Sequence, residues 1–405
     1  MSSSLVVPFH RPSVGEEEIA AIADTLRSGW LTTGPRVAEF ETAFCAYTEA
    51  RFAVAVNSCT AGLHLALAAL RIGEGDEVIT TPLTFCSTVN VILHARATPV
   101  LADVGADGNI NPQRIAECIT RRTKAILPVH LAGLPCDMRA IRELAGRHGI
   151  AVVEDCAHAV GAQVDGQRIG SFPPDQAGRK GMAAFSFYAT KNMTTGEGGM
   201  VTTADQEAAE RVRLLSLHGI SKGAWNRYAD RGHWYYEVLE PGFKYNMMDI
   251  QAAIGIHQLR KLERFLELRA RYAHLYGELL RGVEEVELPP TKLDCRHAWH
   301  LYMLRLHLDR LTISREQFIE QLRERGVGTS VHFIPIPLHP YYAGFPGEAR
   351  GSCPAALSLY PRLVSLPLYP AMTEAQVEYV AHAVRAVVRA SRRQTRVSVA
   401  ACAAT

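Results

Sequence analysis

KAILPVHLAGLPCDMRAIRELAGRHGIAVVEDC (residues 124–156) runs from one short apolar stretch to another through an amphipathic segment. The apolar stretches are KAILPVH (124–130) and IAVVEDC (150–156), and the segment between them stops at a glycine. Short apolar runs indicate buried strands, and an amphipathic segment that stops at glycine indicates a helix. Strand, helix and strand in this order predict a βαβ unit of a parallel sheet.

The same alternation extends outward from this unit, from about residue 50 to about residue 205. Helix-like segments such as TAGLHLALAALRIG separate most of the further apolar runs. We therefore predict a mostly parallel sheet that is buried on both faces, with its chemistry on loops beyond the carboxyl ends of the strands. The further runs are FAVAVN (52–57), DEVITT (76–81), ATPVLAD (97–103), MAAFSFY (182–188) and GMVTT (199–203).

The last third of the chain has a different pattern. A strongly helical segment from about 247 to 281 could bridge two domains, and HAWHLYMLRL and GTSVHF after it indicate strands. Between these two, Ser314 and Gln317 form a capping-box start to a helix that ends at Gly326. This pattern predicts a smaller α+β domain.

We expect three parts along the chain. They are a large α/β domain at residues 1–255, a linking helix with the small domain at 256–390, and a flexible tail at 391–405. The Pro/Gly-rich segment SFPPDQAGRKG (171–181) is predicted to be a surface loop.

Composition excludes several classes of function. The 405 residues are 48% hydrophobic and 21% charged with a net charge of +2, so nothing favours capture of nucleic acid or of an anionic membrane. No apolar run reaches the roughly 18 residues that span a bilayer. The nine cysteines contain no C-x-x-C pair and no signal-peptide pattern precedes them, which predicts reduced thiols in a cytoplasmic protein. The sixteen histidines include no H-E-x-x-H, so we expect no metal site.

Two loops could serve a flat, anionic ligand. NSCTAGLHLAL (57–67) takes a strand end into a helix that starts at Ser58 or Thr60, and a helix start can bind an anion. A plain N-cap explains that segment equally simply. TPLTFCST (81–88) places Phe85 just after a strand, where it could stack on a heterocycle or belong to the core.

Two further loops carry ionisable groups. In VVEDCAHAVG (152–161), Asp155 ends an apolar strand and His158 follows it. A carboxylate there is costly to desolvate, so it either has a cationic partner or caps the next helix. FSFYATKNMTTGEGG (185–199) brings Ser186 and Lys191 into a glycine-rich turn that lacks the P-loop pattern. Taken alone, Lys191 would be an ordinary surface lysine.

Together these four loops supply what one cofactor needs. They offer an anion site, an aromatic ring, a carboxylate for a pyridinium nitrogen and an amine for a Schiff base. That cofactor is pyridoxal phosphate, whose ring withdraws electrons while its nitrogen stays protonated. Burial would help the lysine to lose its proton near neutral pH.

With these motifs in this order, the sequence resembles the DegT/StrS-type sugar aminotransferases, which are fold-type-I pyridoxal-phosphate enzymes. The resemblance covers nearly the whole chain and includes SGWLTTGP (28–35), PGFKYNMMDIQAAIGIHQL (241–259) and GVGTSVHF (326–333). Several stretches are most similar to enzymes that form 4-amino sugars, such as UDP-4-amino-4-deoxy-L-arabinose. The resemblance implies a large domain with a mostly parallel sheet flanked by helices, and a smaller C-terminal α+β domain.

The family's roles at the cofactor ring carry over to matching positions. Lys191 would form the Schiff base and then move a proton between the substrate carbon and the cofactor. Asp155 would pair with the pyridine nitrogen, and His158 would lie near the 3′-oxygen. Phe85 would stack on the ring.

The resemblance also implies a phosphate site and a substrate site. Thr60, Ala61 and Ser186 would hold the phosphate, and Asn246 would reach it from the other subunit of a homodimer with shared active sites. Residues lying toward the sugar would be Thr33, His332 and Phe333.

The implied reaction is transfer of an amino group to a keto group of a nucleotide-linked sugar, a 4-keto hexose or pentose. An amino acid, glutamate on resemblance, would be the donor in a ping-pong mechanism. A cyclitol aminotransferase would use the same chemistry on a carbocyclic ketone. A non-catalytic, cofactor-binding regulatory protein would keep the same residues. Lys191 argues against the dehydratase branch of the family, in which a histidine replaces it, and no arginine can be assigned as the clamp of an amino-acid aminotransferase.

Overall fold

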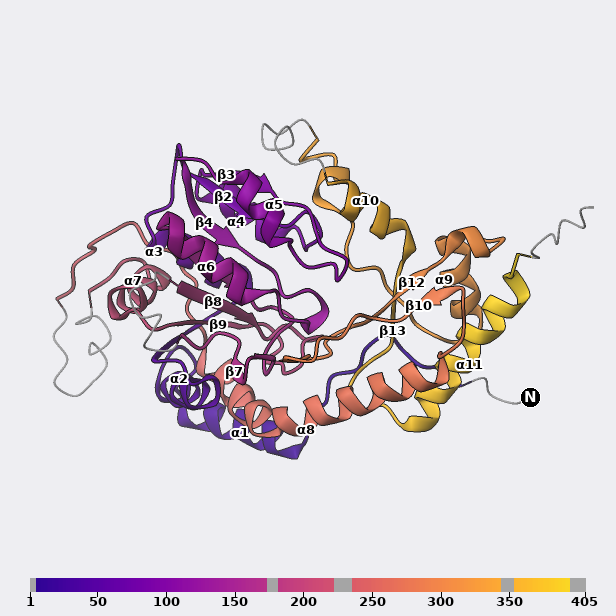
Figure 1. Ribbon diagram of the computed structural model, residues 1–405. Coiled ribbons are helices and arrows are strands. Elements are labelled where there is room, and N and C mark those ends of the chain that lie inside the picture. The colour runs from indigo at the N-terminus through magenta and orange to yellow at the C-terminus, as the bar shows by residue number, and fades with distance from the viewer. Residues whose placement is uncertain (1–4, 173–180, 222–234, 344–352, 394–405) are drawn as a thin grey trace, which may run out of the picture.

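The computed structural model describes residues 5–172, 181–221, 235–343 and 353–393 (Figure 1). The tail predicted at 391–405 lies outside the described residues from 394 onward, and so do residues 173–180 of the predicted loop at 171–181. Among the described residues, no helix is both long enough and apolar enough to cross a membrane.

A seven-stranded sheet forms the centre of the larger half of the molecule. Its strands lie in the order β1-β9-β8-β5-β4-β2-β3, and only β9 runs antiparallel to its neighbours. The predicted mostly parallel sheet is therefore confirmed. The strands are β1 (Phe52–Val56), β2 (Glu77–Thr80), β3 (Thr98–Leu101), β4 (Thr123–Leu127), β5 (Ala151–Asp155), β8 (Gly181–Ser186) and β9 (Gly199–Thr203).

Helices cover both faces of this sheet because its strands are apolar on both sides. Ala53 and Ala55 of β1 belong to one buried cluster and Val54 and Val56 to another, as the two-residue period of a strand requires. The first cluster packs against α2 (Pro35–Thr48), α5 (Pro112–Cys118), α6 (Met138–His148) and α8 (Asp249–Leu279). The second packs against α3 (Cys59–Ala69), α4 (Ser87–His94) and α7 (Gln206–Ser216).

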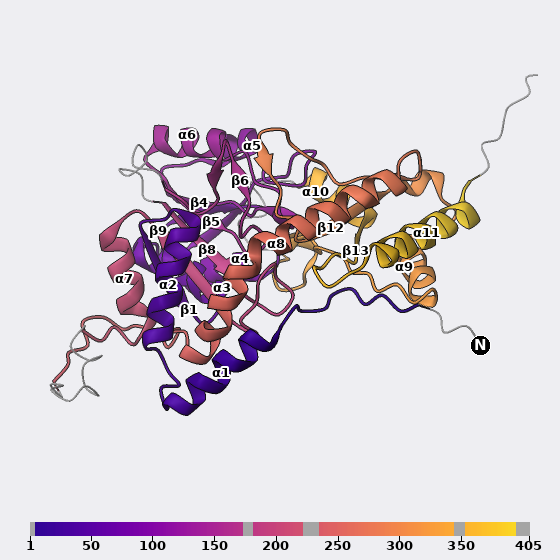
Figure 2. The same cartoon turned by 90° about the horizontal axis from the view of Figure 1, so that it is seen from below.

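A smaller half follows along the long helix α8. Figure 2 shows α8 leaving α1 (Glu16–Ser28) and α2 and continuing to α11, and contacts with all three helices agree. The predicted division at residue 255 falls inside α8 and stays a proposal. The smaller half contains an antiparallel sheet of β10 (Val286–Glu287), β12 (Tyr302–Leu306) and β13 (Leu363–Leu366), with α9 (Arg315–Glu324), α10 (Pro354–Leu359) and α11 (Glu374–Ser391).

Two details of the small half differ from the sequence prediction. GTSVHF does not form a strand: Gly328 N–H bonds to Val7, and Ser330 exchanges bonds with Ser365. Because these partners lie on different segments, no continuous ladder forms. In HAWHLYMLRL the strand begins only at Tyr302, since the preceding backbone bonds to the Ala132 loop.

The capping box of α9 is confirmed. Ser314 accepts a hydrogen bond from the Gln317 N–H, and the Gln317 side chain accepts one from the Ser314 N–H. A third, small antiparallel sheet consists of β11 (Cys295–Arg296), β6 (Gln163–Val164) and β7 (Gln167–Arg168), and it ties the segment before β12 to the loop after β5.

Candidate active site

A cavity of about 440 Å³ opens where the strands of the central sheet end. This volume lies in the usual range of small-molecule sites, about 300–1,000 Å³. β5 ends at Asp155 and β8 at Ser186, so two adjacent parallel strands deliver their last residues to the same edge. The walls comprise Ser58, Cys59, Thr60, Thr84, Phe85, Ser87, Val129, Asp155, Ala157, His158, Ser186, Tyr188, Thr190, Lys191, Glu197, Gly198, His300, His332 and Phe333.

Lys191 enters the cavity from the turn that follows β8. Its own N–H bonds to Tyr188 O at 2.9 Å, and the Thr195 N–H bonds back to Phe187 O at 2.9 Å, so the turn is closed on itself. Burial lowers the pKa of the Lys191 amine to about 8, against the opposing pull of Cys59 and Asp155. A substantial fraction of the amine is therefore neutral near physiological pH, as a nucleophile requires.

Asp155 lies in the same cavity with both carboxylate oxygens engaged. The Ala157 N–H donates to Oδ1 at 3.1 Å, and the Thr88 hydroxyl donates to Oδ2 at 2.9 Å. Burial raises the pKa of Asp155, while these two hydrogen bonds and Lys191 lower it. A buried carboxylate with a raised pKa favours a ligand that brings a positive charge.

His158 is held in one tautomer. The Ala132 N–H donates to its Nδ1 at 3.2 Å, so Nδ1 is unprotonated and Nε2 carries the proton. Burial, with Lys191 and His332 nearby, lowers the pKa of His158 well below its usual value. The ring stacks on Phe333 at 5.6 Å between centroids and is therefore a fixed, neutral donor.

The start of α3 forms another wall. Ser58 caps the helix by accepting a hydrogen bond from the Ala61 N–H at 3.1 Å. The N–H groups of Cys59 and Thr60 precede the first hydrogen bonds of the helix and favour an anion. Thr60 and Ser186 line the cavity beside this helix start, whereas Ala61 is buried behind the lining.

Two aromatic side chains flank the mouth of the cavity. Phe85 is 58% exposed and lies 6.0 Å from Phe333, centroid to centroid. His332 lies beside them, with its Nδ1 2.9 Å from the Ser365 hydroxyl. Burial and Lys191 lower the pKa of His332 to about 4. The mouth thus combines flat apolar surfaces with a neutral imidazole.

Two predicted residues lie together but outside the lining of this cavity. Asn246 donates through its side-chain amide to the Thr33 hydroxyl at 2.7 Å, and Thr33 donates to Met247 O at 2.5 Å. The structure therefore joins Thr33 and Asn246 to each other and not to the other predicted site residues.

His300 is a wall residue that the sequence prediction missed. The Asn192 amide donates to Ala298 O at 2.7 Å, which turns its oxygen toward His300 Nδ1 at 3.2 Å and places a proton on that nitrogen. The ring lies 4.4 Å from that of His158. The segment HAWHLY carries no local signal of this place, because only the folded structure shows that the residues before Tyr302 leave the predicted strand and reach the cavity.

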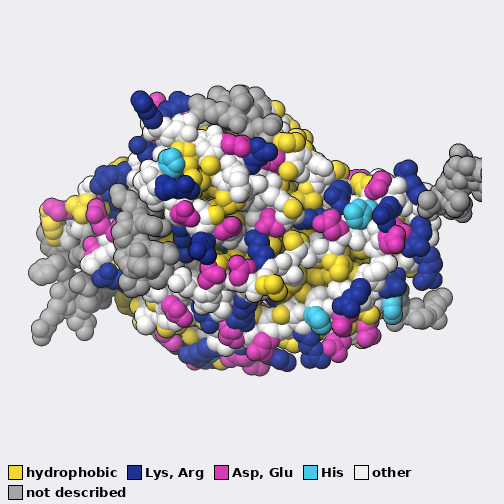
Figure 3. All heavy atoms as spheres, in the orientation of Figure 1, with side chains coloured by type: hydrophobic (Ala, Val, Ile, Leu, Met, Phe, Trp, Pro, Cys, Tyr) yellow, Lys and Arg dark blue, Asp and Glu magenta, His cyan; other side chains and the backbone are white. Residues whose placement is uncertain are grey.

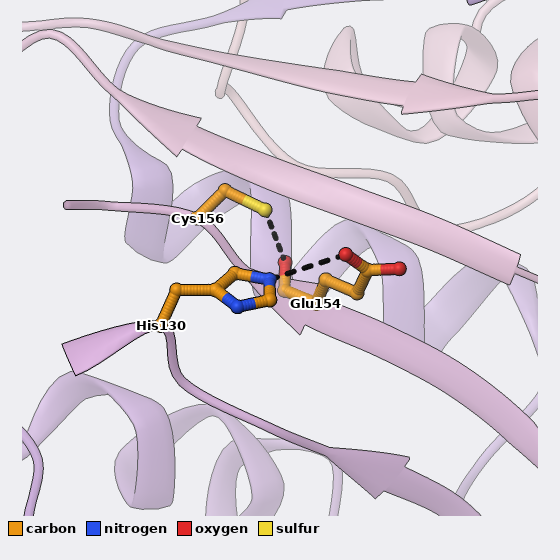
Figure 4. A group of neighbouring side chains, drawn as sticks. All are labelled: His130, Glu154 and Cys156. Carbon is orange, nitrogen blue, oxygen red and sulfur yellow. Dashed lines mark hydrogen bonds and ion pairs between the residues drawn. The ribbon is translucent and has the colours of Figure 1, made fainter. Parts of the chain in front are cut away.

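A buried cluster behind the cavity is the one group in the described residues with the spacing of metal ligands. Figure 4 shows His130, Glu154 and Cys156 of this cluster. The Cys136 N–H donates to His130 Nδ1 at 3.0 Å, which leaves Nε2–H to donate to Glu154 at 3.2 Å. Arg142 also donates to Glu154, and the pKa of Glu154 falls to about 2 despite its burial. These donors already satisfy the carboxylate: Glu154 of β5 forms an ion pair with Arg142 and accepts a hydrogen bond from His130.

The sequence matches a known enzyme family over most of its length. A model of the DegT/DnrJ/EryC1/StrS aminotransferase family matches residues 12–385. The chain belongs to this family. It is 49% identical over 385 residues to the spore coat polysaccharide biosynthesis protein SpsC of Bacillus subtilis, covering 95% of this chain and 97% of SpsC.

Solved structures give the same result. Spr1654 of Streptococcus pneumoniae, assigned as a sugar aminotransferase and solved in its PLP form, is 32% identical with a TM-score of 0.86, covering 95% of this chain and 99% of Spr1654. PseC of Helicobacter pylori, an aminotransferase involved in pseudoaminic acid biosynthesis, is 28% identical with a TM-score of 0.86, covering 95% and 100%.

The chain is accordingly a pyridoxal-phosphate-dependent sugar aminotransferase. Its cavity fits the cofactor on structural grounds. A lysine whose pKa is lowered by burial, a buried carboxylate and the start of a helix share one space. Figure 3 adds that side chains of both charges are interspersed over one face of the molecule, so that face shows no large single-sign patch.

Proposed function

We propose that this enzyme transfers an amino group from glutamate to the keto group of a nucleotide-linked sugar, a 4-keto hexose or pentose, by a ping-pong mechanism. The observation that carries the proposal is the convergence of Lys191 and Asp155 in one cavity at the ends of adjacent strands. Neutral hydrogen-bonding groups at the walls, including Thr84, Tyr188 and His332, suit a substrate rich in hydroxyl groups. The exposed side of Phe85 leaves the mouth open, so a bulky carrier could extend into solvent.

Bound pyridoxal phosphate supplies an electron sink that stabilises negative charge on the substrate carbon. Asp155 would accept a hydrogen bond from the pyridine nitrogen and keep it protonated. His158 would donate from Nε2 toward the 3′-oxygen, and Phe85 would cover one face of the ring. Lys191 would hold the cofactor covalently and then move a proton at its Nζ on and off the reacting carbon.

The phosphate would lie at the start of α3. Thr60 and Ser186 would donate hydroxyl hydrogen bonds to it, and Ala61 would contribute through its place in the first helical turn. His332 and Phe333 reach the mouth from the smaller half and would contact the sugar. This assignment uses the anion preference of a helix start and the neutral state of His332.

We further propose a homodimer in which Asn246 completes the phosphate site of the partner subunit and Thr33 lies toward its sugar. Thr33 and Asn246 lie outside their own cavity, which supports a role in the partner's cavity. Large apolar side chains stand exposed near them, including Trp30, Leu31 and Met248, and a second copy would cover these. We place the enzyme in the cytoplasm, which suits the eight free thiols of the described residues.

The test is an absorbance spectrum of the purified protein before and after glutamate is added. We expect a visible cofactor band that disappears as 2-oxoglutarate is released, and then returns when a keto-sugar nucleotide is supplied. A panel should pair nucleotide-linked 4-keto sugars with a keto-inositol.

The panel separates the alternatives. A band that no amino donor changes would overturn the catalytic proposal in favour of a regulatory protein. Turnover of the keto-inositol without any keto-sugar nucleotide would overturn the assigned substrate and leave the transamination chemistry intact.

A further inference from the structure

Asp155 stands at the end of a directional chain of hydroxyl groups. Thr88 Oγ lies 2.9 Å from Asp155 Oδ2, and Thr84 Oγ lies 2.8 Å from Thr88 Oγ. An ionised carboxylate only accepts hydrogen bonds, so the single hydroxyl proton of Thr88 points to Asp155. Thr84 must then donate to Thr88, which gives the chain one direction.

All three residues that these hydrogen bonds connect are buried. The exposed fraction is 1% for Thr84, 0% for Thr88 and 4% for Asp155. A hydrogen bond to a buried charged group contributes more than one at the surface, because water cannot replace a lost donor. Thr88 is therefore well placed to influence the carboxylate.

The remaining contacts of Asp155 do not replace the hydrogen bond from Thr88. The Ala157 N–H donates to Oδ1, the other carboxylate oxygen. The Cys59 thiol lies 3.9 Å from that same oxygen and is a weak donor. Among the described residues, Thr88 provides the one side-chain hydrogen bond recorded at Oδ2.

The hydroxyl chain also links two parts of the cavity. Thr84 lines the cavity next to Phe85, whereas Thr88 is the second residue of α4 and lies outside the lining. The segment that presents the ring-stacking Phe85 therefore also orients the carboxylate that faces the ring nitrogen.

We propose that Thr88, supported by Thr84, is a positioning residue for transamination, which fixes the orientation of the Asp155 carboxylate toward the cofactor's ring nitrogen. The inference rests on the proposed role of Asp155. Thr88 itself does not line the cavity and acts through Asp155.

The test compares Thr88→Val, which removes the hydroxyl at nearly constant volume, with Thr88→Ser, which retains it. Thr80→Val is the matched control, because Thr80 is equally buried and its hydroxyl donates to Leu127 O at 2.7 Å, away from Asp155. The readouts are the dissociation constant of pyridoxal phosphate, the pH dependence of kcat with KM measured alongside, and the unfolding temperature.

We expect Thr88→Val to lower kcat and cofactor affinity roughly tenfold to a hundredfold, with little change in the KM for glutamate. The acidic limb of its kcat profile should move to higher pH, because a carboxylate that loses a donor protonates more easily. Thr88→Ser should restore both readouts, and Thr80→Val should change only the unfolding temperature.

Two results would overturn the inference. One is a Thr88→Val enzyme with the wild-type acidic limb and cofactor affinity, and the other is an equal shift in Thr80→Val. Asp155→Asn distinguishes the role of Thr88 from that of Asp155. If Asp155→Asn impairs the enzyme while Thr88→Val does not, the positioning role alone is wrong. If neither change has an effect, the assignment of Asp155 is wrong as well.

Discussion

Lys191 and Asp155 experience the same burial with opposite consequences. Removing water disfavours the charged form of each, so the pKa of the amine falls to about 8 while that of the carboxylate rises. Each group nevertheless stabilises the charge of the other. A cofactor that binds the amine covalently and presents a protonated nitrogen to the carboxylate would offset the cost of burial at both groups.

Replacing Lys191 by alanine should remove the covalent link and the proton shuttle together. We expect kcat to fall by at least about 10³-fold while some cofactor stays bound through the other contacts. Single-turnover assays with glutamate measure this, and Lys124→Ala, at an exposed lysine of β4, is the control. Normal turnover by Lys191→Ala would contradict the assignment.

Covalent attachment of pyridoxal phosphate to the apoenzyme should depend on pH through Lys191. The amine is mostly protonated below its pKa of about 8 and mostly neutral above it, so the attachment rate should rise as pH increases from 6 to 9. Stopped-flow absorbance follows the rate. A rate that is flat across this window would show that the amine is already neutral at pH 6 and that burial lowers its pKa further.

At the scale of elements, the site depends on how closely the start of α3 approaches β9. A Cβ on Gly199, the first residue of β9, would lie 2.6–2.7 Å from backbone atoms of Ser58 and Cys59. Backbone atoms cannot move aside as a flexible side chain can. The glycine therefore lets the strand lie against the turn that is proposed to bind the phosphate.

Gly199→Ala should push the start of α3 away from the sheet. We expect a loss of about 1–3 kcal/mol in the free energy of unfolding and a weaker affinity for pyridoxal phosphate. Gly277→Ala is the control, since nothing lies within 4 Å of a Cβ in this part of α8. That change should stabilise the helix by up to about 1 kcal/mol. Chemical denaturation measures the free energy of unfolding of both variants. An unchanged free energy of unfolding in Gly199→Ala would show that α3 can shift freely.

At the scale of the whole molecule, α8 connects the two halves and fixes their relative position. Arg269 of α8 is fully buried and donates to the carbonyl groups of Trp299, His300 and Leu368 in the smaller half. Its position fixes the segment that brings His300 to the cavity. In the proposed homodimer, the partner subunit would complete each cavity with its Asn246.

Subunit complementation tests the shared site. Lys191→Ala and Asn246→Ala should each be nearly inactive alone. If Asn246 acts in the partner's cavity, a heterodimer of the two variants has one intact site, and random mixing should restore about a quarter of the wild-type activity. The assay mixes the two proteins after mild dissociation, with each self-mixed variant as control. No recovery in verified heterodimers would mean that Asn246 serves its own chain.

Local patterns in the sequence were sufficient for much of the fold. Every strand predicted between residues 52 and 203 is present, because apolar runs between turn signals reflect burial on both faces of a sheet. Gly149 ends α6 in a left-handed conformation, and Ser314 caps α9, since both effects act within a few residues. The segment GTSVHF failed as a strand because its bonding partners, Val7 and Ser365, lie on two different segments and no continuous ladder forms.

The candidate site divides in the same way. Four cavity residues could be named from the sequence: Lys191, Asp155, His158 and Phe85. Each lies at or just after the end of a predicted strand, and the ends of parallel strands meet at one edge. Thr88 and His300 could not be named, because a buried threonine in a helix and a histidine before a strand carry no local sign of their partners. The depressed pKa of Lys191 and the tautomer of His158 likewise depend on burial and on hydrogen bonds from distant segments. The order of amino acids determined which reactive side chains follow the strands. Tertiary packing alone decided their protonation states and their neighbours, because desolvation and long-range contacts exist only once the chain has folded.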